Sequence, residues 1–232
     1  MKRIAALIAV TALGACSYGV PYTDAMNVPV RPAAVYRPLH RGSCMLLTVE
    51  YASATVIGPG YAVTNAHADS ALDAFTKYIE NDYADAALFK IEGGETPAIS
   101  DEIEVGEPVI SYGTGCDGST RIAHGIITDT DAALCYGHFP TPSPVCTKMG
   151  YGAQRGMLIK SDSGGGFSGG PVIDMKGRVI GLTEGIMNGQ TFAYRITDVI
   201  AGFQPVLDHP DKADWSHAWI IPPRFLLEGL LL

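Results

Sequence analysis

The 232-residue sequence predicts an all-β domain, and three observations support this prediction. Short apolar runs follow one another closely from residue 45 onward, separated by turn-forming residues. Glycine and proline are frequent, at 27 and 15 residues, which favours a chain rich in turns. A helical pattern is expected only near the end of the domain, over residues 198–207. These features are typical of β-barrels and β-sandwiches.

The expected strands can be placed one by one along the chain. Gly58-Pro59-Gly60 predicts the turn between the second and third of them. We expect strands over residues 45–51, 54–57, 61–64, 86–91, 108–112, 122–128, 157–160, 171–173, 179–182 and 191–196.

The first residues resemble an export signal. Lys2 and Arg3 precede an apolar run over residues 4–13 that is too short to span a bilayer. The run ends in Leu13-Gly14-Ala15-Cys16, which resembles a bacterial lipobox. That resemblance implies removal of residues 1–15, lipidation of Cys16 and, with Ser17 following, an outer-membrane location facing the periplasm of a Gram-negative cell, or another extracytoplasmic surface. An ordinary signal peptide cut elsewhere is the alternative.

Residues 16–41 are expected to form a lipidated cysteine followed by an extended, proline-rich spacer. Four prolines and little periodicity favour this interpretation: Pro21, Pro29, Pro32 and Pro38. The net charge of the whole chain is −8, and removing Lys2 and Arg3 makes it two units more negative. Nucleic acid is therefore not an expected partner.

Four cysteines remain once Cys16 is acylated, and an exported protein meets an oxidising compartment. Cys135 and Cys146 flank a turn-rich segment, so we favour that pair, which leaves Cys44 and Cys116 for a second disulfide. A zinc site is the alternative, although no C-x-x-C spacing supports it.

The segment Gly166-Phe167-Ser168-Gly169-Gly170-Pro171 carries the strongest chemical signal. Glycines allow a tight turn with exposed N–H groups, and two N–H groups aimed at one point stabilise an oxyanion. We assign the oxyanion hole to the N–H groups of Gly166 and Ser168. The hydroxyl of Ser168 needs a neighbouring base before it can attack a carbonyl.

Two segments upstream supply candidates for that base and its partner. His67 follows the apolar strand 61–64 and has alanine on both sides, so its imidazole can face a cleft. Asp85 opens the strand 86–91, where a partly buried carboxylate needs a hydrogen-bond partner. Such a carboxylate would hold the tautomer of His67. Asp82 is the alternative acid.

The order of these segments resembles the chymotrypsin-like, or trypsin-like, serine proteases. The matching motifs are Thr64-Asn65-Ala66-His67, Asp85-Ala86-Ala87-Leu88 and the Ser168 segment. Gly106-Glu107-Pro108-Val109, Gly125-Ile126-Ile127 and Gly177-Arg178-Val179-Ile180-Gly181-Leu182 are similar to bacterial Deg/HtrA-type members. The resemblance implies two six-stranded antiparallel β-barrels over residues 42–204, no PDZ domain after them, and a catalytic site between the barrels.

The resemblance also implies residues of the substrate pocket. Asp162 lies six residues before Ser168, a spacing that in trypsin-like members favours substrates with Arg or Lys before the scissile bond. Thr183, Glu184 and Gly185 resemble the segment that lines the same pocket. Ser163 also stands in a glycine-rich context, but no proline follows its glycines, so we reject it as the nucleophile.

Residues 205–232 lie beyond the resemblance and end in apolar side chains. We expect this tail to pack on the barrels, and contact with a membrane or a partner is the alternative. His209, Asp211 and His217 have unconvincing spacing for a metal site, so we expect neither a metal nor a cofactor. Together these features predict an exported, lipid-anchored serine endopeptidase acting on proteins or peptides. The alternative is an inactive protease fold that serves as a binding or scaffold protein.

Overall fold

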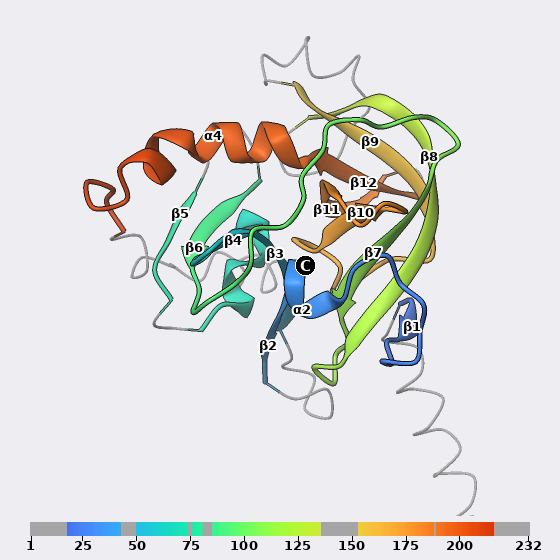
Figure 1. Cartoon of the computed structure of the whole chain (residues 1–232), viewed down its shortest axis with the longest axis horizontal. Coiled ribbons are helices and arrows are strands. Elements are labelled where there is room, and N and C mark those ends of the chain that lie inside the picture. The colour runs from blue at the N-terminus through green and yellow to red at the C-terminus, as the bar shows by residue number, and fades with distance from the viewer. Residues whose placement is uncertain are drawn as a thin grey trace, which may run out of the picture.

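The computed structural model of the protein describes residues 18–42, 50–73, 76–80, 85–135, 153–187 and 189–215. Within these ranges the chain forms two antiparallel sheets, one of seven strands and one of five (Figure 1). Helical structure is confined to short segments and one longer helix near residue 200. The predicted all-β class is therefore confirmed.

Six strands of the larger sheet close into a barrel. They are β7 (Pro108–Thr114), β8 (Thr120–Cys135), β9 (Ala153–Ser161), β10 (Pro171–Asp174), β11 (Val179–Met187) and β12 (Gln190–Arg195). Their order is β8-β7-β10-β11-β12-β9, and β9 pairs back onto β8. Register shifts on either side of Asp129 bend the long β8, so its first half pairs with β7 and most of its length with β9. A two-residue strand, β1 (Val20–Pro21), adds to the outer edge of β8.

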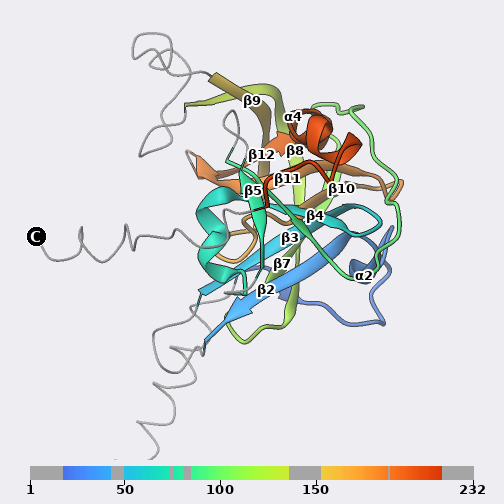
Figure 2. The ribbon, with the colours of Figure 1, turned by 90° about the vertical axis from the view of Figure 1, so that its left-hand side faces the viewer.

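The second sheet has the order β2-β3-β4-β6-β5. Its strands are β2 (Tyr36–Arg41), β3 (Glu50–Gly58), β4 (Tyr61–Thr64), β6 (Ala87–Lys90) and β5 (Tyr78–Glu80). Figure 2 shows β2 and β3 side by side in the turned view, in agreement with their pairing. The expectation of two six-stranded barrels is thus confirmed for one barrel, whereas the part of the second that the structure describes is a five-stranded sheet without closure.

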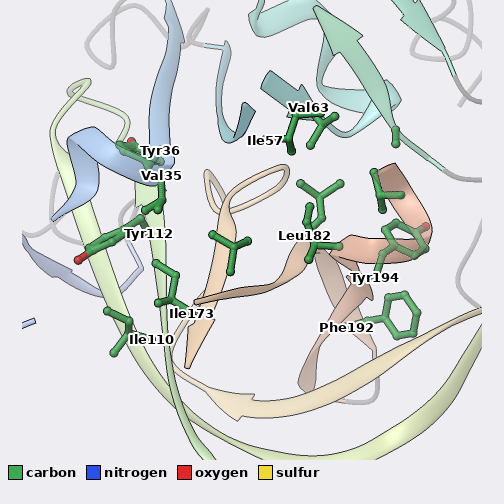
Figure 3. Close-up of a cluster of buried hydrophobic side chains, with 14 of the residues drawn as sticks. Val35, Tyr36, Ile57, Val63, Ile110, Tyr112, Ile173, Leu182, Phe192 and Tyr194 are labelled. Atoms are coloured by element: carbon green, nitrogen blue, oxygen red, sulfur yellow. The ribbon is translucent and has the colours of Figure 1, made fainter. Parts of the chain in front are cut away.

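The main core lies between the two sheets and joins them. It draws Ile57 and Val63 from the five-stranded sheet and Ile173 and Leu182 from the barrel, all nearly inaccessible to solvent (Figure 3). Phe192 and Tyr194 extend it with an edge-to-face ring contact at 5.3 Å between centroids. Because this core spans both sheets, residues carried by the two sheets hold fixed positions relative to one another.

Helix α4 (Ile196–Asp208) confirms the helix expected near the end of the domain. Its apolar side packs into the main core through Ile196, Val199 and Phe203. Farther on, the ring of Trp215 stacks on Tyr61 of β4 at 6.3 Å between centroids. The beginning of the expected tail therefore packs on the sheets, and residues 216–232 lie outside the described ranges. Among the described residues, none of the helices has the length and apolarity needed to span a membrane.

The N-terminal segment differs from the extended spacer that we expected. Residues 18–41 pack onto the domain, and β2 at their end is a strand of the five-stranded sheet. Tyr22 meets Tyr112 edge-to-face at 6.0 Å, and the Tyr112 hydroxyl donates to the main-chain oxygen of Val30 at 2.6 Å. Helix α2 (Pro32–Val35) follows, with proline at its start, where proline is tolerated.

The physical reason for this difference lies in the side chains between the prolines. Tyr22, Met26, Val28 and Val30 all pack against the main core, and their burial outweighs the preference of a proline-rich chain for extended structure. The folded domain therefore begins near residue 18 and not at residue 42. Only Ser17 separates this packed segment from Cys16.

Candidate active site

His67 lies where the five-stranded sheet ends. Strand β4 stops at Thr64, and the chain turns into the short 3₁₀ helix η2 (Ala66–Ala71). Ala68 is buried beneath this turn, and the side chain of His67 remains 44% exposed. The small neighbours therefore leave the imidazole partly exposed, and the cleft that we expect it to face stays a prediction.

Asp85 lies buried just before β6 and is bound to His67 through both of its oxygens. Oδ1 accepts a hydrogen bond from the backbone N–H of His67 at 2.9 Å, and Oδ2 contacts the imidazole Nδ1. Asn65 donates from Nδ2 to the main-chain oxygen of Asp85 at 2.9 Å and holds the segment in place. With Nδ1 engaged in this way, Nε2 is left as the nitrogen that can accept a proton. The alternative acid, Asp82, lies outside the described residues.

Ser168 lies on the loop between β9 and β10, which we call the serine loop (residues 162–170). Gly166 and Gly169 have φ angles of 87° and 79°, in the left-handed region that glycine adopts without strain. A Cβ at Gly169 would lie 2.2 Å from both Ser53 O and Thr64 Oγ1. The glycines therefore allow the loop to approach the other sheet closely.

Strand β3 braces this loop through a network that the sequence analysis missed. Ser53 donates from Oγ to the main-chain oxygen of Gly166 at 2.6 Å, and its N–H donates to Ser168 O at 2.8 Å. Thr55 donates from Oγ1 to Gly169 O at 2.9 Å. The available signal in the sequence was the presence of two hydroxyl residues, Ser53 and Thr55, in an otherwise apolar run. A hydroxyl that becomes buried requires a hydrogen-bond partner.

The Ser168 hydroxyl itself donates to the main-chain oxygen of Glu184 at 3.0 Å, and not to the imidazole of His67. The Asp85–His67 half of the expected triad is therefore formed, while the serine is turned toward Glu184. Among the described residues, no acceptor binds the N–H groups of Gly166 and Ser168, whereas the N–H of Phe167 donates to Gly164 O at 3.0 Å. Two free N–H groups beside a serine hydroxyl are the arrangement that an oxyanion hole needs.

Glu184 lies at a bulge in β11, where the pairing register with β12 shifts between Thr183 and Gly185. A bulge redirects side chains, and here it brings the carboxyl group of Glu184 close to His67 and Asp85. One ligand atom from each of these three residues lies within 4.8 Å of the others. Imidazole and two carboxylates can bind a cation, but the contact between His67 and Asp85 already engages two of the three groups.

This crowding of acids shifts two pKa values. Burial disfavours the charged imidazole, but the hydrogen bond and charge of Asp85, with the charges of Glu184 and Asp69, outweigh it and raise the pKa of His67 above its ordinary value. Burial, together with the charge of Asp85, raises the pKa of Glu184 to about 7, although nearby His67 opposes that rise.

A pH-rate profile tests this electrostatic arrangement. A general base must be neutral, so activity should fall as the pH drops through the raised pKa of His67. Glu184→Gln removes a negative charge that favours the imidazolium, and the pKa of His67 should therefore decrease. We expect the acid limb of kcat/KM to move to lower pH in this variant. An unmoved limb would show that Glu184 does not act on His67.

The residues expected to line the substrate pocket do not all lie together. Asp162 is exposed, and its Oδ1 accepts from the backbone N–H of His124 on β8 at 3.0 Å. Ser163 is buried beside it, in hydroxyl contact with Ser161 and Thr191. The buried side chains next to Asp162 therefore carry hydroxyl groups and no charge.

Two further pocket candidates, Thr183 and Gly185, differ in what they contact. Thr183 is buried, and its main chain exchanges two hydrogen bonds of 2.8 Å with Gly169 and Gly170, so it braces the serine loop. Gly185 has open space where a Cβ would stand. Gly185 is thus the member of the predicted set that leaves room for a substrate.

The four disulfide candidates fall mostly outside the described side chains. Cys116 is buried. Cys44 and Cys146 lie outside the described ranges, and the side chain of Cys135 is likewise not described. The two pairings that we favour stay predictions, as do the lipidation of Cys16 and the zinc alternative.

Comparisons with known proteins identify the domain type. A family model described as a trypsin-like peptidase domain matches residues 69–182, a stretch that includes Asp85 and Ser168 and begins two residues after His67. No curated protein matches the sequence.

Solved structures share the fold at low sequence identity. The active form of the Rv3671c protease from M. tuberculosis has a TM-score of 0.59 and 18% identity, over 80% of this chain and 87% of that chain. The MamO protease domain from Magnetospirillum magneticum has a TM-score of 0.54 and 19% identity, over 73% and 95%. The HtrA-type protease AlgW, solved with a decapeptide, has a TM-score of 0.54 and 18% identity, over 70% and 53%.

Proposed function

The chain carries the trypsin-like peptidase domain of a serine endopeptidase, and from this premise we propose that Ser168, His67 and Asp85 form its catalytic triad. The observation that carries the proposal is the buried Asp85 bound to both the backbone and the imidazole of His67. The serine loop, braced from β3, presents Ser168 beside the two free N–H groups of Gly166 and Ser168.

In the proposed reaction the Ser168 hydroxyl turns from Glu184 O to His67 and attacks the peptide carbonyl. The imidazole Nε2 takes the hydroxyl proton and then delivers it to the leaving amine. Asp85 stabilises the imidazolium formed in between, and the N–H groups of Gly166 and Ser168 hold the oxyanion. Water then hydrolyses the acyl-enzyme by the same base, and no cofactor takes part in these steps.

One observation favours the second candidate function, an inactive binding or scaffold protein. The Ser168 hydroxyl is bound to a main-chain oxygen and not to the base. Labelling of the purified full-length protein by a fluorophosphonate separates the two functions, because only an activated serine attacks the phosphorus, displaces fluoride and becomes phosphonylated. We expect labelling of Ser168. A folded wild-type protein that stays unlabelled would contradict the enzyme and leave the binding function.

The proposal includes anchoring of the enzyme to the cell envelope through Cys16. Its support is the lipobox-like Leu13-Gly14-Ala15-Cys16 and the apolar run before it. Cys16→Ser should release the protein from the membrane fraction, because the acyl chains on Cys16 would anchor the protein in the bilayer. Fractionation followed by detection of the protein measures this result. A variant that stays with the membrane would contradict the lipid anchor or assign the hold to the C-terminal tail.

The proposal also includes a preference for Arg or Lys before the scissile bond. Asp162 has the required spacing, but one of its oxygens is already bound by the N–H of His124. If the other oxygen pairs with the substrate, Asp162→Ser should lower kcat/KM for Arg and Lys substrates about 10- to 100-fold relative to apolar ones. A peptide library measures the preference. An unchanged profile would assign the pocket to the hydroxyls of Ser163 and Thr191.

A further inference from the structure

The residues directly after the predicted lipid anchor contact the serine loop. We call residues 18–22 the N-terminal strap. Its Val20 and Pro21 pair with Ile122 and Arg121 of β8 as strand β1, and its Tyr22 N–H donates to Thr120 O at 2.9 Å. These bonds fix the strap to the barrel wall beside the point where the serine loop begins.

Tyr18 covers the serine loop from this position. A Cβ added to Gly164 would lie 2.2 Å from Tyr18 Cγ, so the absence of a side chain at Gly164 is what admits the ring. The N–H of Gly19 donates to Asp162 O at 3.1 Å. Gly19 itself has a φ of 64° and approaches so closely that a Cβ there would meet Phe167 Cζ at 2.9 Å. The strap therefore contacts the loop at Asp162, Gly164 and Phe167.

The loop needs such contacts because of its composition. Gly164, Gly165 and Gly166 are consecutive, and glycine loses more conformational freedom on ordering than any other residue. The peptide between Gly165 and Gly166 carries the N–H that we assign to the oxyanion hole. The Ser53 hydroxyl and the Thr114 N–H both donate to the carbonyl oxygen of Gly166. That oxygen belongs to the peptide after Gly166 and not to the peptide that carries the Gly166 N–H. At Gly164, just before that peptide, the ring of Tyr18 is the packing partner.

We propose that the N-terminal strap is a positioning element for the oxyanion hole, with the ring of Tyr18 on Gly164 as its main contact. This inference rests on the proposed function. Tyr18 acts through the backbone of the loop and does not touch the reacting atoms. Catalysis and attachment are then coupled along the chain, because only Ser17 lies between Tyr18 and Cys16, the proposed lipidation site. The Cα atoms of Cys16 and Tyr18 are therefore at most about 7 Å apart.

The test uses the full-length chain and measures four quantities: the rate at which a fluorophosphonate phosphonylates Ser168, kcat and KM on a peptide ester, and Tm. Tyr18→Ala should lower the phosphonylation rate and kcat about 10- to 100-fold, the order expected for a displaced catalytic group. KM should change little. Tm should also change little, because Tyr18 is 52% exposed. Tyr18→Phe keeps the ring and should keep the activity.

Val105→Ala is the matched control, since it removes another exposed apolar side chain, from the turn before β7. It should behave as the wild type does. Phosphonylation of a folded Tyr18→Ala variant at the wild-type rate would overturn the proposal, as would an equal loss in Tyr18→Phe. An unlabelled wild type would instead remove the proposed enzymatic function, so the two failures are distinguishable.

A second variant decides the case if Tyr18→Ala does not fold. Gly164→Ala leaves the sequence of the strap unchanged but places a methyl group where the Tyr18 ring lies, so that the ring must move. The backbone of Gly164 is not in the left-handed region, so alanine is not strained there. It should lower the phosphonylation rate, and the double variant with Tyr18→Ala should be no slower than Tyr18→Ala alone where that protein folds. A folded Gly164→Ala with wild-type rates, or losses that multiply in the double variant, would overturn the proposal.

Discussion

Ser168→Ala should lower kcat on a peptide substrate by roughly a million-fold, the order seen when the nucleophile of a serine triad is removed. His67→Ala should cost about as much. The double variant should be no worse than either single one, because nucleophile and base act as a unit. Single-turnover kinetics on the purified full-length protein, with Tm as the check on folding, measures these losses.

The matched control for this prediction is Ser163→Ala. Ser163 lies in the same serine loop with glycine after it, but its hydroxyl is buried in contact with Ser161 and Thr191. Fluorophosphonate labelling should persist in Ser163→Ala and be lost in Ser168→Ala. The reverse pattern would show that the nucleophile has been assigned to the wrong serine.

Asp85→Asn should lower kcat by about 10⁴-fold, the effect expected when an amide replaces the buried acid of a triad. The carboxylate of Asp85 accepts from both the backbone N–H and the imidazole of His67. An amide in its place presents an NH₂ group to one of these donors and favours the wrong imidazole tautomer. The pKa of His67 should also decrease, because Asp85 is its strongest charged partner.

Asp69→Asn provides the matched control for Asp85. Asp69 also lies near His67 and raises its pKa, but its carboxylate accepts from the hydroxyl of Tyr78 at 3.1 Å. Its loss should shift the acid limb slightly and leave the maximal kcat close to that of the wild type. Asp82→Asn completes the comparison. A larger loss in Asp82→Asn than in Asp85→Asn would transfer the acid role to Asp82.

The three triad candidates could be predicted because each depends on its immediate neighbours in the chain. Small residues around His67, an acid opening an apolar strand at Asp85, and glycines flanking Ser168 are local patterns. The contact between His67 and Asp85 then follows from the antiparallel pairing of β4 with β6, which places the end of β4 beside the start of β6. Strand positions were predictable for a similar reason, and Tyr61–Thr64 is observed with the predicted bounds.

The misread segment lies between residues 18 and 41, where the local pattern and the tertiary environment disagree. Prolines and weak periodicity predicted an extended spacer, but partners distant in sequence, such as Tyr112 for Tyr22, bury its side chains. The same limit applies to Asp162, whose spacing predicted a pocket residue. The structure adds a contact that this spacing could not predict, because the backbone N–H of His124 on β8 binds one oxygen of the exposed Asp162 carboxylate.

The sequence by itself determined the all-β class, the approximate positions of most strands and the candidate residues His67, Asp85 and Ser168, because turns, apolar runs and glycine-rich loops depend on near neighbours. Only the tertiary structure decided that the strap contacts the serine loop, that Ser53 braces Gly166, and that Glu184 lies beside His67 and Asp85. These contacts join residues far apart in the chain. They depend on strand register, on a bulge in β11, and on how closely two sheets approach across a shared core.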